Sequence, residues 1–278
     1  MKFAPCTAMA AALILGLSAC DRQETAGDAP AVAEAASLEA LNGTWKADLA
    51  SIKFEGKPNE VLLQGSTYDC KTCIPPLTVP ADGKFHPVAD RPYFDSISVK
   101  TIDDRTVEIR RRKGEREVSS TIMQVSEDGN AMNSKFTNAN NPSVPPIKGT
   151  ETARRAGPAP AGAHAISGQW APERVQDYSE DALNITFRVV GNQVTMTAQG
   201  ESYNAEIGGP AVPVEGDSGG TTIAVSREGN GLRETATRGG KEVNQTIIMP
   251  SADGSSVTFT STDPRDGEKT TWTAKKTG

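Results

Sequence analysis

The chain has 278 residues, of which 36% are hydrophobic and 5% aromatic, and its formal net charge is -6. This length accommodates two domains of ordinary size. The negative charge argues against a nucleic-acid partner, because proteins that bind nucleic acid normally carry a basic surface that neutralises phosphates. Abundant Thr, Val and Gly favour short strands and turns, and the 4 cysteines are too few to form a disulfide scaffold.

The N-terminus has the features of a bacterial lipoprotein signal. An apolar run from Ala8 to Leu17 is too short to span a bilayer and fits the core of a signal peptide. It ends in Leu17-Ser18-Ala19-Cys20, which resembles the lipobox of bacterial lipoproteins. The resemblance implies that residues 1–19 are removed and that Cys20 becomes an acylated N-terminus. The alternative is an ordinary secretory signal.

An acylated Cys20 predicts a membrane anchor. Each buried methylene contributes about 0.8 kcal/mol, so several acyl chains hold a protein firmly. We therefore expect a cell-envelope protein that faces the periplasm, at either the inner or the outer membrane. Residues 20–37 contain no aromatic side chain and no apolar face, which predicts a flexible tether.

Two versions of one sequence unit follow the tether. Gly43-Thr44-Trp45 returns as Gly168-Gln169-Trp170, 125 residues later. Lys113-Gly114 corresponds to Arg238-Gly239 at the same spacing. A spacing that is kept through many turns indicates a duplication.

The duplication predicts two domains, at residues 38–157 and 166–278, joined by a Pro/Gly/Ala linker at residues 158–165 that breaks both helix and strand. Asp-Gly dipeptides and alternating apolar residues indicate about eight short hairpin-linked strands per domain. Consecutive hairpins favour an up-and-down barrel, because closure removes the exposed edges of a sheet. We expect an all-β fold with two tandem antiparallel barrels.

The two Gly-x-Trp motifs, Gly43 to Trp45 and Gly168 to Trp170, resemble the signature of the lipocalin superfamily. Both units are more closely similar to bacterial lipocalin-like domains of unassigned activity. The matching stretches are Asp82 to Val88, Tyr93 to Lys100 and Asp104 to Glu108. The resemblance covers about four fifths of the chain, and it indicates the fold rather than the ligand.

The resemblance also implies a role for the two tryptophans. In lipocalins this side chain closes the floor of the barrel, and a basic residue from the last strand covers it in a cation–π contact. In the first unit, this would bring Arg154 or Arg155 over Trp45. In the second unit, Lys275 or Lys276 would cover Trp170.

A barrel of this kind either fills its interior with side chains or holds one small ligand. We therefore expect a protein without enzymatic activity that binds a small apolar ligand or an envelope protein. We expect no cofactor and no metal.

The first unit alone contains Cys70-Lys71-Thr72-Cys73. In an oxidising envelope compartment, this spacing favours a local disulfide between Cys70 and Cys73. Two alternatives remain. A thiol–disulfide redox pair lacks the helix N-terminus that lowers the pKa of such thiols, and a zinc site lacks a second ligand pair, since only His86 is near in the sequence.

Gly216-Asp217-Ser218-Gly219-Gly220 is identical to the segment around the nucleophile of trypsin-like proteases. That chemistry requires a histidine base beside the serine. The two histidines, His86 and His164, stand outside the expected motif. We interpret the segment as a turn.

Arg110 to Lys113, together with Arg116, concentrate positive charge at one predicted hairpin. We interpret them as a solvated hairpin tip. Contact with anionic lipid headgroups or an acidic partner is the alternative.

Overall fold

The computed structural model describes residues 37–277. In this part of the chain, two short 3-10 helices and twenty β-strands are joined by turns. The helices are η1 (Leu38–Leu41) and η2 (Glu180–Leu183). The strands of the first repeat are β1 (Gly43–Glu55), β2 (Asn59–Gln64), β3 (Thr67–Cys70), β4 (Leu77–Pro80), β5 (Asp82–Pro87), β6 (Ser96–Asp103), β7 (Thr106–Lys113), β8 (Arg116–Val125), β9 (Ala131–Asn138) and β10 (Ile147–Arg155). Those of the second are β11 (Gly168–Gln176), β12 (Asn184–Val190), β13 (Gln193–Ala198), β14 (Glu201–Glu206), β15 (Val212–Pro213), β16 (Thr221–Glu228), β17 (Gly231–Arg238), β18 (Lys241–Pro250), β19 (Ser256–Thr262) and β20 (Lys269–Thr277).

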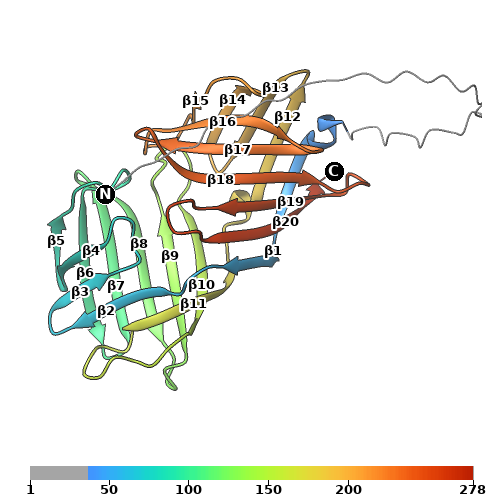
Figure 1. Cartoon of the computed structure of the whole chain (residues 1–278). Helices are drawn as coiled ribbons and strands as arrows, with labels where there is room; N and C mark the ends of the chain where they lie inside the picture. The colour runs from blue at the N-terminus through green and yellow to red at the C-terminus, as the bar shows by residue number, and fades with distance from the viewer. Residues whose placement is uncertain (1–36, 278) are drawn as a thin grey trace, which may run out of the picture. The chain divides into compact units, whose positions relative to one another are not determined.

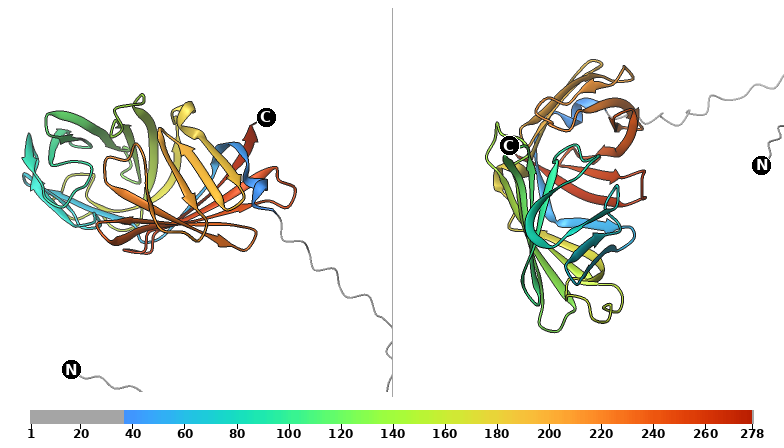
Figure 2. Two further views of the ribbon diagram at one scale, coloured as in Figure 1. Left: turned by 90° about the horizontal axis from the view of Figure 1, so that it is seen from above. Right: turned by 90° about the vertical axis from the view of Figure 1, so that its left-hand side faces the viewer.

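The strands form two antiparallel sheets of ten strands, each of which curls into a nearly closed barrel (Figures 1 and 2). Barrel A has the strand order β14-β13-β12-β1-β20-β19-β18-β17-β16-β15, and barrel B has the order β4-β3-β2-β11-β10-β9-β8-β7-β6-β5. The predicted all-β fold with two tandem barrels is confirmed. Each barrel has more strands than expected, because very short strands such as β15, and β4 and β5 on either side of Ala81, divide the longer stretches.

The first strand of each repeat lies in the barrel of the other repeat. β1 pairs with β12 and β20 in barrel A, whereas β11 pairs with β2 and β10 in barrel B. All other neighbours follow the expected consecutive order. The linker at residues 158–165 therefore separates the repeats in the sequence, but each barrel is built from both repeats.

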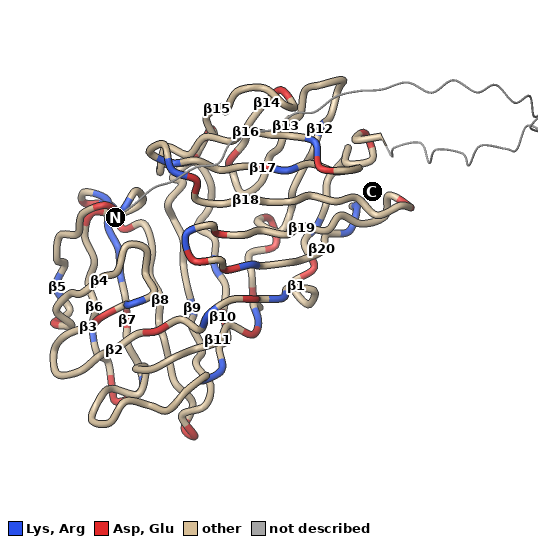
Figure 3. The backbone as a smooth tube through the Cα atoms, in the orientation of Figure 1, with Lys and Arg blue, Asp and Glu red and all other residues tan. Residues whose placement is uncertain are grey.

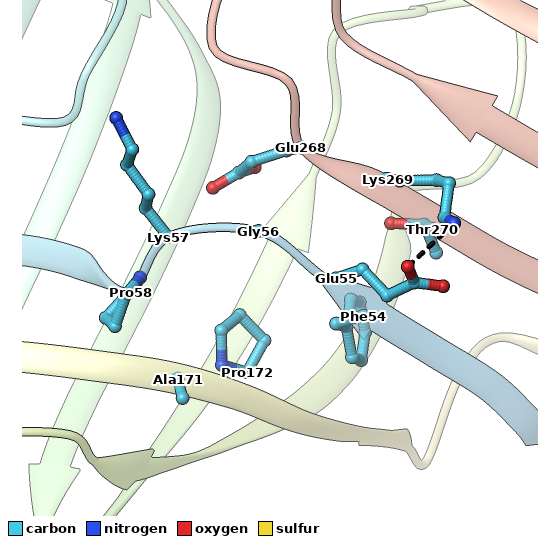
Figure 4. A pocket seen from close by; sticks show the side chains of 10 residues that line it. All are labelled: Phe54, Glu55, Gly56, Lys57, Pro58, Ala171, Pro172, Glu268, Lys269 and Thr270. Carbon is cyan, nitrogen blue, oxygen red and sulfur yellow. Dashed lines mark ion pairs between the residues drawn. The ribbon is translucent and has the colours of Figure 1, made fainter.

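The segment between β1 and β2 explains this exchange. Figure 4 shows Gly56 and Lys57 continuing from the end of β1 toward Pro58 without reversing the direction of the chain. A hairpin that returned β2 against β1 would need a reversal here. The segment borders a small cavity of about 70 Å³, where Lys269 Nζ pairs with Glu55 Oε2 at 2.7 Å. This space is too small for an organic ligand.

Trp45 and Trp170 are fully buried among the core residues of barrel A and barrel B, respectively. The Trp45 indole donates a hydrogen bond of 2.8 Å to the carbonyl of Leu41, and Trp170 donates one of the same length to Ile166. Both copies of the motif thus form the same local structure, in agreement with the duplication.

The predicted pairing of cations with tryptophans was wrong in one respect. Lys276 Nζ lies 5.2 Å from the centre of the Trp45 ring, and Arg155 Cζ lies 4.1 Å from that of Trp170. Each tryptophan is covered by a cation from the other repeat, because the strand that carries the tryptophan lies in the barrel of the other repeat. Side chains alternate along a strand, so Lys275 and Arg154 point the other way. Lys275 pairs with Asp48 at 3.5 Å, and Arg154 pairs with Glu173 at 3.2 Å.

The glycines of the motif make room for these cations. Gly43 and Gly168 adopt φ angles of 126° and 122°, which residues that carry a side chain rarely adopt. A Cβ atom at Gly43 would lie 2.9 Å from Lys276 Cε, and one at Gly168 would lie 2.7 Å from Arg155 Nη1. Glycine therefore allows the cation to lie over the tryptophan ring.

Candidate ligand site

Barrel A contains a cavity of about 430 Å³. Around Trp45, the interior is filled by buried residues such as Val189, Leu232 and Val257. The cavity is lined by residues of β12, β13, β14, β17, β18, β19 and β20. Small-molecule sites in proteins typically have volumes of about 300–1,000 Å³, so the cavity has a suitable size for a ligand.

Aromatic side chains form one wall of the cavity. Phe259 on β19 and Trp272 on β20 are cross-strand partners. Their rings are stacked with centroids 5.1 Å apart and planes 3° apart. Phe187 on β12 lies next to Phe259, with ring centroids 6.2 Å apart, and Met196 also borders the cavity. Such a wall suits a planar apolar molecule.

One acidic side chain, Glu234, lies deep in the barrel. It projects inward from β17 between the buried residues Leu232 and Ala236. It is surrounded by protein, although the part of its surface that borders the cavity stays accessible. Burial raises the pKa of Glu234 to about 7, against the smaller opposing effect of a hydrogen bond that the Tyr203 phenol donates to Oε1. Burial and the neighbouring Glu234 also raise the pKa of Tyr203.

Uncharged polar groups on β18 and β19 complete the lining. Ser261 Oγ donates a hydrogen bond of 2.8 Å to Asn244 Oδ1, and Asn244 Nδ2 donates one of 3.0 Å to Thr246 Oγ1. Glu201 lines the same cavity, and its pKa is raised by burial and then by the negative charge of Asp217. The lining therefore combines aromatic surface with hydrogen-bonding groups and two acids.

Barrel B has a different interior. At the repeat spacing of 125 residues, Glu234 corresponds to Ile109, and Ala236 corresponds to Arg111. The Arg111 guanidinium lies 5.4 Å from the centre of the Phe94 ring and donates a hydrogen bond of 3.4 Å to Ser119 Oγ. Burial lowers the pKa of Arg111. The two repeats thus carry interior charges of opposite sign at neighbouring positions.

The two cysteines of the first repeat lie at disulfide distance. Their Sγ atoms are 2.03 Å apart and their Cα atoms are 5.4 Å apart. Cys70 ends β3 and is buried in the core of barrel B, and Cys73 packs against that core. Neither 3-10 helix of residues 37–277 begins at this pair, so no helix N-terminus faces the sulfur atoms.

The segment from Gly216 to Gly220 lies in a turn, as predicted. Asp217 accepts hydrogen bonds from the Thr221 amide at 2.7 Å and from the Tyr93 hydroxyl at 2.9 Å. The two histidines bond elsewhere, His86 to Asp82 and His164 to the carbonyl of Asp103. The arrangement that a serine protease requires is not formed by these residues.

Successive side chains of β7 point to opposite faces of the sheet, so the basic residues from Arg110 to Lys113 are divided between the interior and the exterior of the barrel. Arg111 faces the interior, whereas Arg112 Cζ lies 3.8 Å from the centre of the Phe85 ring and Arg110 pairs with Glu117. Arg116 donates to the carbonyls of residues 139 and 140. Basic and acidic residues are interspersed over the strands of both barrels (Figure 3). The cluster is therefore not a uniform solvated tip, since its cations make local contacts.

We compared the chain with protein-family models, curated proteins and solved structures, and these comparisons gave no match. Between residues 37 and 277, no group of His, Cys, Asp and Glu side chains is arranged to hold a metal. No helix in this range has the length and apolar character needed to cross a membrane. The predicted signal peptide, Cys20 and residues 21–36 of the tether lie outside the described residues.

The main residues of the cavity were not identified from the sequence. A signal was present for Glu234, because Leu232, Glu234 and Ala236 alternate with polar residues and the charge falls at an inward position. No comparable signal marked Trp272, since its neighbours are threonines on both sides.

Proposed function

We propose that this protein binds a small apolar molecule in barrel A and that it acts as a non-enzymatic, lipid-anchored protein of the cell envelope. The observation that carries the proposal is the cavity of about 430 Å³ with the stacked Phe259 and Trp272 rings in its wall. Removing apolar surface from water contributes about 25 cal/mol per Å², so a ring system held against these side chains would gain most of its affinity there.

The predicted location rests on the lipobox-like sequence at Leu17 to Cys20. An anchored barrel would present its cavity to molecules of the periplasm. The resemblance to bacterial lipocalin-like domains supports the same proposal, because barrels of this kind hold small ligands in their interior. A protein partner is the alternative occupant of the sequence-based hypothesis, and it has no comparable observation in its favour.

The thiol–disulfide hypothesis has less support. Catalytic thiols are normally partly exposed and lie at a helix N-terminus or beside a cation. Cys70 is instead buried among Val61, Leu77 and other apolar residues. We therefore regard the pair as a structural disulfide of barrel B.

Native mass spectrometry of the full-length protein, extracted from its host membrane, tests the ligand proposal. We expect bound molecules on the wild-type protein and their loss in Ser261→Phe, which fills the cavity with the residue that barrel B carries at the corresponding position, Phe136. Thr260→Phe places the same side chain on the other face of β19 and should retain the ligand. Equal spectra for wild type and Ser261→Phe would contradict the proposal.

A further inference from the structure

We propose that the ligand of barrel A is an organic amine with a planar apolar body, whose ammonium group binds the carboxylate of Glu234. This inference rests on the proposed function and specifies the chemical class of the ligand. It follows from the hydrogen bonding of Glu234, from the aromatic groups around it and from the charge of the lining.

Glu234 has one free hydrogen-bonding oxygen. Its carboxylate accepts the Tyr203 hydrogen bond at Oε1, and no described hydrogen bond uses Oε2. The neighbours that influence the pKa of Glu234 include no cation. A buried carboxylate without a positive partner is costly. A ligand that brings an ammonium group would supply both the missing charge and the missing donor.

The aromatic rings of the cavity wall also favour a ligand that carries an ammonium group. Aromatic faces attract cations, and they do so more strongly where water is excluded. Phe187, Phe259 and Trp272 line the cavity together with Glu234, and the Tyr203 hydroxyl donates a hydrogen bond to the carboxylate. An ammonium group attached to a planar apolar body could therefore contact Glu234 while the body packs against the Phe259–Trp272 wall.

The charge of the lining separates cations from anions. Glu201 and Glu234 are the acidic residues of the lining, and no Lys or Arg belongs to it. The lining side chains from β12, β13, β18, β19 and β20 are uncharged. Outside the lining, the Tyr203 hydroxyl on β14 bonds to Glu234, and the Arg238 charge acts on Glu201. A carboxylate or phosphate ligand would meet two acids and no base, whereas an amine meets complementary charge.

Isothermal titration calorimetry on the full-length protein in phosphatidylcholine nanodiscs tests this inference, with empty nanodiscs as the blank. The probes are three molecules of similar shape: 1-naphthylmethylamine, 1-naphthylmethanol and 1-naphthoate. At pH 8, we expect the amine to bind about tenfold more tightly than the alcohol, and the naphthoate to bind least. Glu234→Gln should remove the preference for the amine and leave the affinity for the alcohol unchanged.

Glu206→Gln is the matched control, because Glu206 is exposed on β14 of the same barrel. It should keep the preference for the amine. Lowering the pH to 6 should weaken binding of the amine to the wild-type protein, since Glu234 must lose its proton for the ion pair to form.

The inference is overturned if the amine fails to bind, if the alcohol or naphthoate binds as tightly, or if Glu234→Gln keeps the preference. These results leave the proposed function intact as long as Ser261→Phe removes bound molecules in the native mass spectra. Both fail together only if the wild-type and Ser261→Phe spectra are also the same.

Discussion

The Lys276 ammonium lies over the ring of Trp45, although Lys276 belongs to the last strand of the second repeat and Trp45 to the first strand of the first repeat. The same relationship joins Arg155 to Trp170 in the opposite sense. The tryptophan–cation contact of each barrel is thus assembled from both repeats. A change in the strand exchange would separate each tryptophan from the cation that covers it.

Cleavage of the linker should not separate the two halves of the protein. If a protease site is inserted at Ala159 to Ala161, we expect the cut fragments to migrate together in size-exclusion chromatography. Each fragment provides the other with a strand that has backbone partners on both sides, β1 for barrel A and β11 for barrel B. Elution as two separate folded fragments would contradict the exchange.

Gly168→Ala should destabilise the protein by about 2 kcal/mol or more, measured by urea denaturation. The added Cβ would displace the Arg155 guanidinium, which donates hydrogen bonds to the carbonyls of Ser167 at 2.8 Å and Ala165 at 2.7 Å. Gly254→Ala is the control, because Gly254 also has a positive φ but its Cβ would enter open space. A loss at Gly168 no greater than that at Gly254 would show that the position of Arg155 contributes little.

The stability of the protein should contain a pH-dependent contribution from Glu234. Its pKa of about 7 in the folded state exceeds the usual value for Glu, so the folded state holds the proton more tightly. The contribution is therefore fully favourable below the unfolded pKa and falls as the pH rises toward 7, by about 3 kcal/mol at most.

Urea denaturation at pH 5 and pH 8 measures this contribution. Glu234→Gln removes the titrating group, so the loss of stability between the two pH values should be smaller in the variant than in the wild type. Glu206→Gln, which changes an exposed acid, should behave like the wild type. An unchanged pH dependence in Glu234→Gln would mean that Glu234 is ionised at both pH values or titrates equally in the unfolded chain.

Reduction of the disulfide should have a small effect that is confined to stability. The bond between Cys70 and Cys73 closes a loop of a few residues, for which loop entropy predicts about 2 kcal/mol. We expect dithiothreitol to lower the urea midpoint while the 1-naphthylmethylamine affinity of barrel A stays the same. Reduction of insulin disulfides by the protein would instead favour the thiol–disulfide hypothesis.

The overall fold could be predicted from the sequence because its signals are local. The turn dipeptide Asp128-Gly129 and the alternation of Val257, Phe259 and Ser261 identify hairpins without knowledge of distant contacts. The barrels follow from the number and succession of such strands.

The strand exchange could not be predicted in the same way. The Gly43-Thr44-Trp45 and Gly168-Gln169-Trp170 strands present the same inward tryptophan and the same close-approach glycine. Both strands offer the same tryptophan and glycine, so the local pattern does not distinguish the two pairings. The cavity was missed for a related reason, because the space beside Glu234 depends on side chains from strands far apart in the sequence.

The exchange also sets an order in which the strands can find their partners during synthesis. β1 is made first, but its neighbours β12 and β20 belong to the second repeat, and β20 is made last. Barrel B can be completed as soon as β11 has been made, whereas barrel A must wait for the end of the chain. Until β12 has been made, β1 has neither of its ladder partners, and until β20 has been made it has only one, so the Trp45 side chain, fully buried in the finished protein, lacks part of its cover for most of synthesis.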